Sequence, residues 1–377
     1  MDKSVKVVVL TEEGRGGGAL VRILRITPNL PPSTSVVVFC PKTATDYIRQ
    51  LKDKRISFRA ISLRPLSKNV YKLISYLWFF IPEMVGLIRL MRSEAVDVIH
   101  CNGSWQFKGV LAAMVTGIPA IWHMNDTRQP LPVRFVFNLL SRIPTGYIYA
   151  SKSTRQYYEE LAPAISSKLN TIISPPVPIP NPLQGDDLNQ FTGINVVSVG
   201  YINPNKGYEL MVEIAFELQR TNPNQYHWHL IGPVLPTQRR YYGKLVRLID
   251  KYKLRNFHFW GYRNDINQLV SSADIYLCTS YYESSPMALW EAMSCRVPAI
   301  STNVGDVQEI FERAGCGICL NDRNPTNFVD NILKLVNNPE WRQSISDKAQ
   351  HVIRETFNPD TISGQYTEIY HQVSNSR

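Results

Sequence analysis

Two carboxylates, Glu283 and Glu291, stand on either side of a Ser-Ser-Pro turn in the run YYESSPMALWEAMSCRVPAIST at 281–302. We expect Ser285 to cap a short apolar helix in which Pro286 is the first residue. The free N–H groups and positive dipole end of such a helix favour an anion such as a phosphate. Glu291 would lie about 7.5 Å along the axis from Pro286, at about 1.5 Å per residue. This spacing suits a ligand with hydroxyls on both sides of a phosphate group, and a nucleotide sugar is such a ligand.

The same segment resembles the E-x7-E motif of the retaining GT-B glycosyltransferases of the glycosyltransferase family 4 type. The resemblance continues through VPAIST to GDVQE at 305–309, a run of 27 residues from Glu283. It implies two Rossmann-like domains with parallel sheets, a ligand in the cleft between them, and sugar transfer with retention of configuration. It also implies that no metal or other cofactor is required. Glu283 would hold the donor sugar hydroxyls and Glu291 the ribose, and the donor would meet the helix opening at Ser284, Ser285, Pro286 and Met287.

A second motif, SVGYINPNKGYELMVEI at 198–214, resembles the phosphate-binding motif of the family's second domain. Lys206 precedes a glycine at the opening of a helix, where an ammonium group can stabilise the charge that builds on a leaving diphosphate. Tyr201 departs from the family pattern, which has Arg directly after the strand glycine. A tyrosine donates one hydrogen bond but brings no charge. We therefore expect more of the diphosphate to rest on Lys206 and the helix opening.

Glycines follow the first expected strand in VVVLTEEGRGGGALVRILR. Gly14, Gly16 and Ala19 formally satisfy the dinucleotide-binding pattern, but no acidic residue ends the second strand to bind a ribose. An NAD-dependent oxidoreductase is therefore a distant alternative. By the family resemblance, the loop formed by Gly16, Gly17 and Gly18 approaches the donor phosphates and the acceptor.

Several single residues complete the predicted site. His123 lies at the end of the expected strand PAIWHM at 119–124, and the resemblance implies a contact with the donor sugar or the acceptor. His100 is interpreted as structural. Gly232 ends the HLIG strand at a glycine turn of the family. Tyr262 and Arg263, in FWGYRND, resemble a loop that cups the nucleotide base.

Composition limits the classes of partner. The chain has 377 residues, enough for two domains, and its net charge of +10 indicates an anionic partner. Lys and Arg are scattered and form no basic stripe interleaved with aromatics, so nucleic acid is not expected. CGIC at 316–319 is a lone CxxC with no second pair or nearby His, so we interpret its thiols as structural and expect no metal site. The start, MDKSVKVVVLTEEG, lacks the apolar region of a signal peptide, which predicts a reducing, cytoplasmic setting.

The most apolar stretch, at 70–91, is broken by charged residues and Pro82, and is too interrupted for a membrane span. Two interpretations stay open. The stretch could be a core helix pair of the first domain, which we prefer. It could instead be a face that rests peripherally on an anionic membrane, with Lys68, Lys72 and Arg89 near lipid phosphates.

Short β-branched runs alternate with helical patterns in both halves, which predicts an α/β protein with parallel sheets. We expect a first domain at 1–178, a Pro-rich linker at 179–190, a second, nucleotide-sugar-binding domain at 191–359, and a C-terminal helix at 360–377 that crosses back to the first domain. Strands are expected at 5–10, 35–40, 57–63, 97–101, 119–124, 146–151, 194–200, 226–232, 257–261, 275–280, 298–302 and 317–320.

The resulting expectation is a metal-independent, retaining glycosyltransferase of the hexosyltransferase type. It would move a sugar from a UDP- or GDP-linked donor to a hydroxyl of a glycan or lipid-linked acceptor, in surface polysaccharide or glycolipid biosynthesis. Two alternatives stay open: a nucleotide-sugar epimerase or hydrolase on the same fold, and a non-catalytic sugar-nucleotide binder. The oligomeric state is not determined by the sequence.

Overall fold

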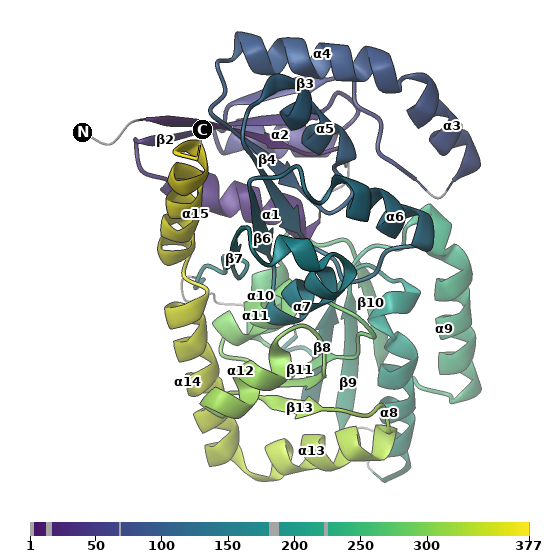
Figure 1. Cartoon of the computed structure of the whole chain (residues 1–377). Helices are drawn as coiled ribbons and strands as arrows, with labels where there is room; N and C mark the ends of the chain where they lie inside the picture. The colour runs from purple at the N-terminus through teal and green to yellow at the C-terminus, as the bar shows by residue number, and fades with distance from the viewer. Residues whose placement is uncertain (1–3, 13–16, 68, 181–187, 222–224, 377) are drawn as a thin grey trace. The chain divides into compact units, whose positions relative to one another are not determined.

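The computed structural model describes residues 4–12, 17–67, 69–180, 188–221 and 225–376 (Figure 1). The chain divides into two compact units. The first comprises Met1–Pro176 together with Pro359–Arg377, and the second comprises Val177–Asn358. Each unit has its own sheet and its own core.

The first unit is built on a seven-stranded parallel sheet with the order β3-β2-β1-β4-β5-β6-β7. The side chains of its central strands are buried on both faces because helices cover both sides of a parallel sheet. The strands are β1 (Val5–Leu10), β2 (Thr34–Pro41), β3 (Phe58–Ile61), β4 (Val98–Asn102), β5 (Ala120–Met124), β6 (Gly146–Tyr149) and β7 (Leu169–Ile172).

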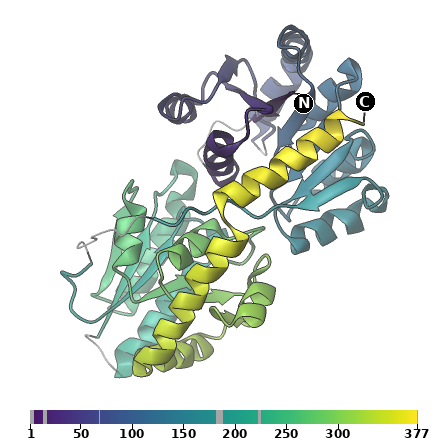
Figure 2. The same ribbon diagram turned by 90° about the vertical axis from the view of Figure 1, so that its left-hand side faces the viewer.

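Two helical layers close the core of the first unit. One contains α4, α5 and α6, and the other contains α1, α2 and the C-terminal helix α15, drawn in yellow in Figure 2. The helices are α1 (Gly18–Ile26), α2 (Thr45–Asp53), α3 (Val70–Trp78), α4 (Phe80–Ser93), α5 (Phe107–Thr116), α6 (Leu131–Leu140), α7 (Lys152–Leu161) and α15 (Pro359–Ser374), with 3-10 turns η1 (Thr27–Asn29) and η2 (Pro163–Ile165).

The apolar stretch at 70–91 forms α3 and most of α4, which meet at Phe79. Helix α4 buries Met84, Leu87 and Met91, whereas α3 buries only Tyr76. The core interpretation therefore holds for α4 and is wrong for α3. Within the described ranges, no single helix is long and apolar enough to cross a membrane; α3 and α4 meet that criterion only as a pair, bent by 56°.

The second unit has a six-stranded parallel sheet with the order β10-β9-β8-β11-β12-β13. Its strands are β8 (Ile194–Val199), β9 (Tyr226–Ile231), β10 (Phe257–Gly261), β11 (Ile275–Cys278), β12 (Ala299–Thr302) and β13 (Ile318–Leu320). Its helices are α8 (Tyr208–Thr221), α9 (Arg239–Lys251), α10 (Ile266–Ser271), α11 (Met287–Ser294), α12 (Val307–Ala314), α13 (Pro325–Asn337) and α14 (Pro339–Thr356), with 3-10 turns η3 (Pro204–Lys206) and η4 (Pro236–Gln238).

Both sheets are entirely parallel, so the predicted architecture of two Rossmann-like α/β domains is confirmed. All twelve strands expected from the sequence form, with small shifts at their ends. One further strand, β7, was not predicted, because it is only four residues long (LNTI) and only partly buried. The carboxyl ends of parallel strands meet at one edge of each sheet, and this edge carries the predicted site residues.

Candidate active site

The ends of β8 and β9 approach each other closely in the second unit. Gly200 follows β8 and Gly232 follows β9, and both have a φ of 151°. A Cβ added at Gly232 would lie 2.0 Å from the carbonyl oxygen of Gly200. Gly232 is therefore required for the packing of two strand ends, and it shapes the edge on which the next loops rest.

Two of the predicted catalytic residues meet at this edge. Lys206 Nζ lies 2.8 Å from Glu283 Oε1, and each side chain is about a fifth exposed. Ser280 Oγ donates to the same carboxylate oxygen at 3.0 Å. Burial by itself would lower the pKa of Lys206, but the negative charge and hydrogen bond of Glu283, together with Tyr208 and Cys278, outweigh it and the pKa is raised. The site therefore holds a fixed ammonium group that keeps its proton.

Hydrogen bonds join the Lys206 turn to the segment after β11. Thr279 Oγ1 donates to the carbonyl oxygen of Lys206 at 2.9 Å, and the amide of Tyr281 donates to Asn205 O at 2.8 Å. Asn205 Nδ2 donates to Tyr282 O at 2.7 Å. The two loops that carry Lys206 and Glu283 thus share a set of bonds that fixes their spacing.

Arg323, which follows β13, strengthens this junction. Its Nη1 donates to Thr279 O at 2.7 Å, its Nη2 donates to Gly207 O at 3.2 Å, and its guanidinium carbon lies 3.8 Å from the ring centre of Tyr281. Gly207 has a φ of 59°, and a Cβ there would lie 2.5 Å from Arg323 Nη2. Sequence reasoning missed Arg323 because it belongs to no motif and is more than forty residues from the loop it holds.

The helix at the E-x7-E segment begins one residue later than expected. Pro286 occupies the N-cap and the helix runs over Met287–Ser294, with no side-chain cap. The prediction that Ser285 caps the helix is therefore wrong. Its hydroxyl oxygen accepts a hydrogen bond from the indole Nε1 of buried Trp290 at 3.0 Å, and this bond ties the Ser-Ser-Pro turn to the helix that follows it. Ser284 and Glu291 are half-buried, on the turn and on the helix respectively.

The three remaining candidates of the second unit lie at strand ends. Tyr201 is half-buried directly after Gly200, and Tyr262 is 76% exposed after β10. Arg263 Nε donates to Asp265 Oδ1 at 2.8 Å, and the guanidinium lies 5.4 Å from the ring centre of Trp260. Arg263 is thus held by its own loop, while Tyr262 presents its ring to solvent.

His123 belongs to the first unit, where its side chain is fully buried near the end of β5. Arg22 Nη1, from α1, lies 2.6 Å from His123 Nε2, and His100 Nε2, from β4, lies 3.1 Å from His123 Nδ1. Burial first, then the charge of Arg22 and the neighbouring His100, hold the pKa of His123 well below its usual range. Burial and Arg22 likewise lower the pKa of His100 to about 3. Both imidazoles are therefore neutral.

The hydrogen bonds around His123 run in one direction. Arg22 can only donate, so His123 Nε2 accepts and its proton sits on Nδ1. That proton is donated to His100 Nε2, and His100 Nδ1 then donates to Tyr370 Oη of α15 at 2.8 Å. This series of hydrogen bonds is consistent with the structural role expected for His100.

Of the predicted glycine loop, Gly17 is the N-cap of α1 and Gly18 its first helical residue. Gly16 lies outside the described residues. Asn102 Nδ2 donates to Ala19 O at 3.2 Å and so ties the start of α1 to the end of β4.

Glu12, just after β1, is a buried acid that sequence reasoning did not single out. Lys108 Nζ lies 3.7 Å from Glu12 and 2.7 Å from Glu83, and Arg64 pairs with Glu83 as well. Burial raises the pKa of Glu12 to about 7; Lys108 opposes this shift and Glu83 adds to it. This buried ion cluster, formed by Glu12, Arg64, Glu83 and Lys108, joins β1, α4 and α5.

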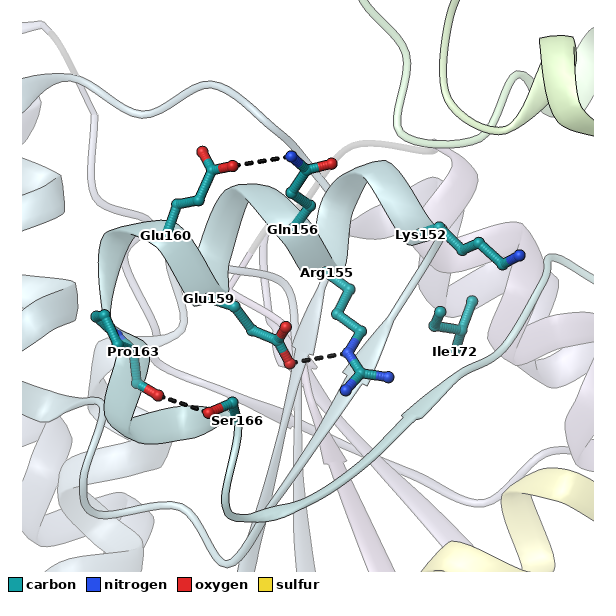
Figure 3. A pocket seen from close by; sticks show the side chains of 8 residues that line it. All are labelled: Lys152, Arg155, Gln156, Glu159, Glu160, Pro163, Ser166 and Ile172. Atoms are coloured by element: carbon teal, nitrogen blue, oxygen red, sulfur yellow. Dashed lines mark hydrogen bonds and ion pairs between the residues drawn. The ribbon is translucent and has the colours of Figure 1, made fainter.

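A metal-ion site and a surface pocket were each sought near the predicted site residues. In the described parts of the chain, no group of three or more His, Cys, Asp or Glu residues is arranged to hold a metal ion. A pocket of about 570 Å³ lies along α7 (Figure 3), where Arg155 pairs with Glu159 at 2.8 Å and Gln156 donates to Glu160 at 2.9 Å. None of the predicted site residues lines it.

Comparison with known proteins finds a family similarity in the second unit. Residues 189–352 match the sequence model of the family described as glycosyl transferases group 1. These residues are similar to that family. The matched segment includes Lys206, Glu283 and Glu291, and the match agrees with the resemblance seen in the E-x7-E segment.

Individual relatives and solved structures are also similar to the chain. N-acetyl-alpha-D-glucosaminyl L-malate synthase of Bacillus anthracis is 30% identical over 30% of this chain and 30% of its own length. Lipopolysaccharide glucosyltransferase WaaG of Escherichia coli is 27% identical over 41% of each chain. The chain thus matches less than half the length of these curated relatives. Among solved structures, Anabaena HepE in complex with UDP is 20% identical, covers 97% of this chain and 99% of its own, and has a TM-score of 0.83, which shows a shared GT-B fold.

Proposed function

We propose that the protein transfers a sugar from a nucleotide-diphosphate donor to a hydroxyl acceptor, with retention of configuration and without an essential metal. The observation that carries the proposal is the Lys206–Glu283 pair, 2.8 Å apart at the strand ends of a group 1 domain. One neighbour of the same fold has been solved with UDP-glucose, which supports a nucleotide-sugar donor.

Lys206 would stabilise the departing diphosphate. Negative charge develops on the phosphate oxygen as the bond to the sugar breaks, and a preorganised ammonium group at that point lowers the barrier. Glu283 raises the pKa of Lys206, so that the ammonium keeps its charge. The bonds from Asn205 and Thr279 hold the turn before the donor arrives, so little reorganisation is needed.

The two glutamates would divide the recognition of the donor. Glu283 would accept hydrogen bonds from the sugar hydroxyls and Glu291, further along α11, from the ribose hydroxyls. Tyr201 would donate to the diphosphate, and Tyr262 would pack against the base. The backbone from Ser284 to Met287 would face the phosphates at the positive end of α11.

His123 enters the proposal as a neutral hydrogen-bonding group that positions the sugar or the acceptor. It would act neither as an acid nor as a base, because burial and Arg22 keep its pKa far below neutrality. Arg22 already donates to Nε2, so a contact with the substrate would require Arg22 to move away.

The proposed donor is UDP- or GDP-linked, and the proposed acceptor is a hydroxyl of a glycan or a lipid-linked sugar in surface polysaccharide or glycolipid synthesis. WaaG, named as a lipopolysaccharide glucosyltransferase, supports this class of acceptor. UDP-glucose is the first donor to test.

The test begins with thermal-shift measurements against UDP- and GDP-sugars, because a ligand that binds the folded state raises Tm by mass action. The best donor is then incubated, labelled, with and without glycan acceptors and with and without EDTA. Acceptor-dependent transfer that survives EDTA, with the anomeric configuration retained by NMR, is the expected result. Release or rearrangement of the sugar without an acceptor would identify a hydrolase or epimerase instead, and binding without turnover would identify a sugar-nucleotide binder.

A further inference from the structure

Exposed apolar side chains gather on α3 and the first turns of α4. On α3, Tyr71 is 84% exposed, Trp78 78% and Leu77 63%, and on α4 Ile81 is 67% exposed. Their neighbours Val70, Leu73, Ile74, Phe79 and Val85 are exposed as well. We call these nine residues the α3–α4 face. So many large apolar side chains within sixteen residues mark an interaction surface rather than ordinary scatter.

Basic side chains extend the α3–α4 face. Arg89 and Arg92 are exposed on the side of α4 that carries Ile81 and Val85, because positions 81, 85, 89 and 92 recur at helical spacing. Lys72 is exposed on α3. The acid in residues 69–93 is Glu83, which is buried in the ion cluster with Arg64 and Lys108. Among residues 69–93, the exposed charge is therefore entirely positive.

From this arrangement we infer that the α3–α4 face docks on the surface of an anionic lipid bilayer. The apolar and aromatic side chains would enter the interfacial region, where Trp and Tyr are favoured, and the basic side chains would contact lipid phosphates. A second copy of the chain fits less well, because a symmetric interface would bring like basic charges together. The inference does not rest on the proposed sugar transfer.

The face would lie on the bilayer rather than cross it. Helix α4 is fixed to the first unit because Met84, Leu87 and Met91 are part of its core. At the joint between the helices, the guanidinium of Arg64 lies 3.6 Å from the ring centre of Phe79 and the ammonium of Lys108 lies 3.9 Å from that of Tyr76. These two contacts, made from the core side of the helices, fix the 56° bend between α3 and α4, so that the two helices keep one relative orientation.

Co-sedimentation with vesicles tests the inference. The full chain is mixed with vesicles of phosphatidylcholine alone or with phosphatidylglycerol added, at low and high salt and without nucleotide sugar. One variant carries Leu77→Ser with Trp78→Ser, and a second carries Arg89→Glu with Arg92→Glu. The matched controls are Trp341→Ser on α14 and Arg240→Glu with Arg247→Glu on α9, which change exposed residues of the second unit in the same way.

We expect binding that requires phosphatidylglycerol and weakens with salt. Each basic residue near an anionic surface contributes about fivefold to partitioning, so the charge-reversal variant should bind at least about 25-fold more weakly. The apolar variant should lose binding at both salt concentrations, and the controls should bind as the unmodified chain does with an unchanged Tm. The inference is overturned if the chain does not bind these vesicles or if the charge-reversal variant on α4 binds as well as the charge-reversal control on α9. It is also overturned if sedimentation equilibrium shows a dimer that the same variants dissociate.

Discussion

Lys206 is partly buried, and its ammonium group nevertheless remains charged. The Glu283 carboxylate is the largest of the contributions that offset the cost of burial, so the ammonium on the strand-end loop keeps its charge. This is the arrangement that a developing phosphate charge needs, because a group that must first be protonated or reoriented stabilises a transition state poorly.

Lys206→Ala should lower kcat by about 10²- to 10³-fold, the usual cost of removing one preorganised charge-stabilising group. Steady-state kinetics with a saturating donor measure this. Lys251→Ala, which removes an exposed lysine of α9, is the control. Near-normal turnover in the Lys206 variant would refute the leaving-group role.

Glu291→Ala should raise the donor KM by at least about tenfold and leave Tm nearly unchanged, because a half-buried carboxylate that accepts ribose hydroxyls contributes mostly to binding. Initial-rate kinetics and donor titrations by thermal shift measure the two quantities. Glu355→Ala, at an exposed position of α14, should leave both unchanged. An unaltered donor KM would remove the ribose assignment.

At the scale of single residues, the sequence predicted best those site residues that lie together in one continuous segment. The E-x7-E run and the Lys206 turn are continuous segments whose residue types carry their chemistry. The capping role of Ser285 failed because Trp290, five residues on, uses the serine oxygen. The burial of His123 was not predictable, since it bonds to Arg22 of α1 and His100 of β4 and its ring lies against Tyr366 of α15, all in other elements.

Among the elements, the loops after β8, β11 and β13 act together. Arg323 joins all three, through Gly207 O, Thr279 O and the ring of Tyr281. A single guanidinium makes these contacts because it is planar and carries several donors in a fixed geometry, and a lysine in the same place offers only a point charge.

Arg323→Lys should therefore lower kcat more than it raises the donor KM, because the charge is kept while the spacing of Lys206 and Glu283 is relaxed. We expect a fall of about tenfold or more in kcat with a small change in Tm. Kinetics and thermal unfolding separate the two effects. Arg313→Lys, on the exposed side of α12, is the matched control. Equal behaviour of the two variants would show that Arg323 does not position the site.

The buried ion cluster predicts a pH dependence of stability in the first unit. The pKa of Glu12 rises from its ordinary 4.5 to about 7 on folding, so between these values the folded state binds more protons than the unfolded state. Stability from this group is present at low pH and declines as the pH rises toward 7. Lys108 and Glu83 face the same carboxyl and share the titration.

Glu12→Gln removes that titration. The stability of the variant relative to the unmodified chain should increase between pH 5 and pH 7.5 by an amount on the order of 3 kcal/mol. Urea unfolding of the first unit, followed at both pH values, measures the difference. A difference that stays constant with pH would show that Glu12 is ionised throughout.

The whole molecule illustrates what alternation of strands and helices can and cannot predict. Parallel sheets follow from hydrophobic strands separated by helices, and both formed as expected. The exposure of α3 corresponds to the less preferred of the two interpretations of this stretch, because an apolar helix next to a strand was expected to pack on the sheet. Composition alone does not distinguish a helix buried in a core from one presented to a lipid surface.

The C-terminal helix α15 supplies Ile362, Tyr366, Ile369, Tyr370 and Val373 to the core of the first unit, beside β1 and β4. A chain that ends at Asn358 should leave the first unit without part of its core, while the second unit keeps its own. In limited proteolysis, we expect the truncated chain to give no protease-resistant fragment from the first unit. The second unit should still be protected from cleavage when the donor is added. Protection of both units would contradict the prediction.

The shared core of β1 and α15 also has a consequence for how the protein is made. A ribosome delivers the first strand at residues 5–10 and the helix that covers it only from residue 359, so the 348 residues from 11 to 358 are synthesised between them. All of the second unit emerges in that interval and has every residue of its own core before the first unit does. The order of completion is therefore the reverse of the order of synthesis, and the sheet of the first unit stays partly uncovered until α15 has been synthesised. Chaperones that shield nascent chains would be expected to stay on the first unit longest.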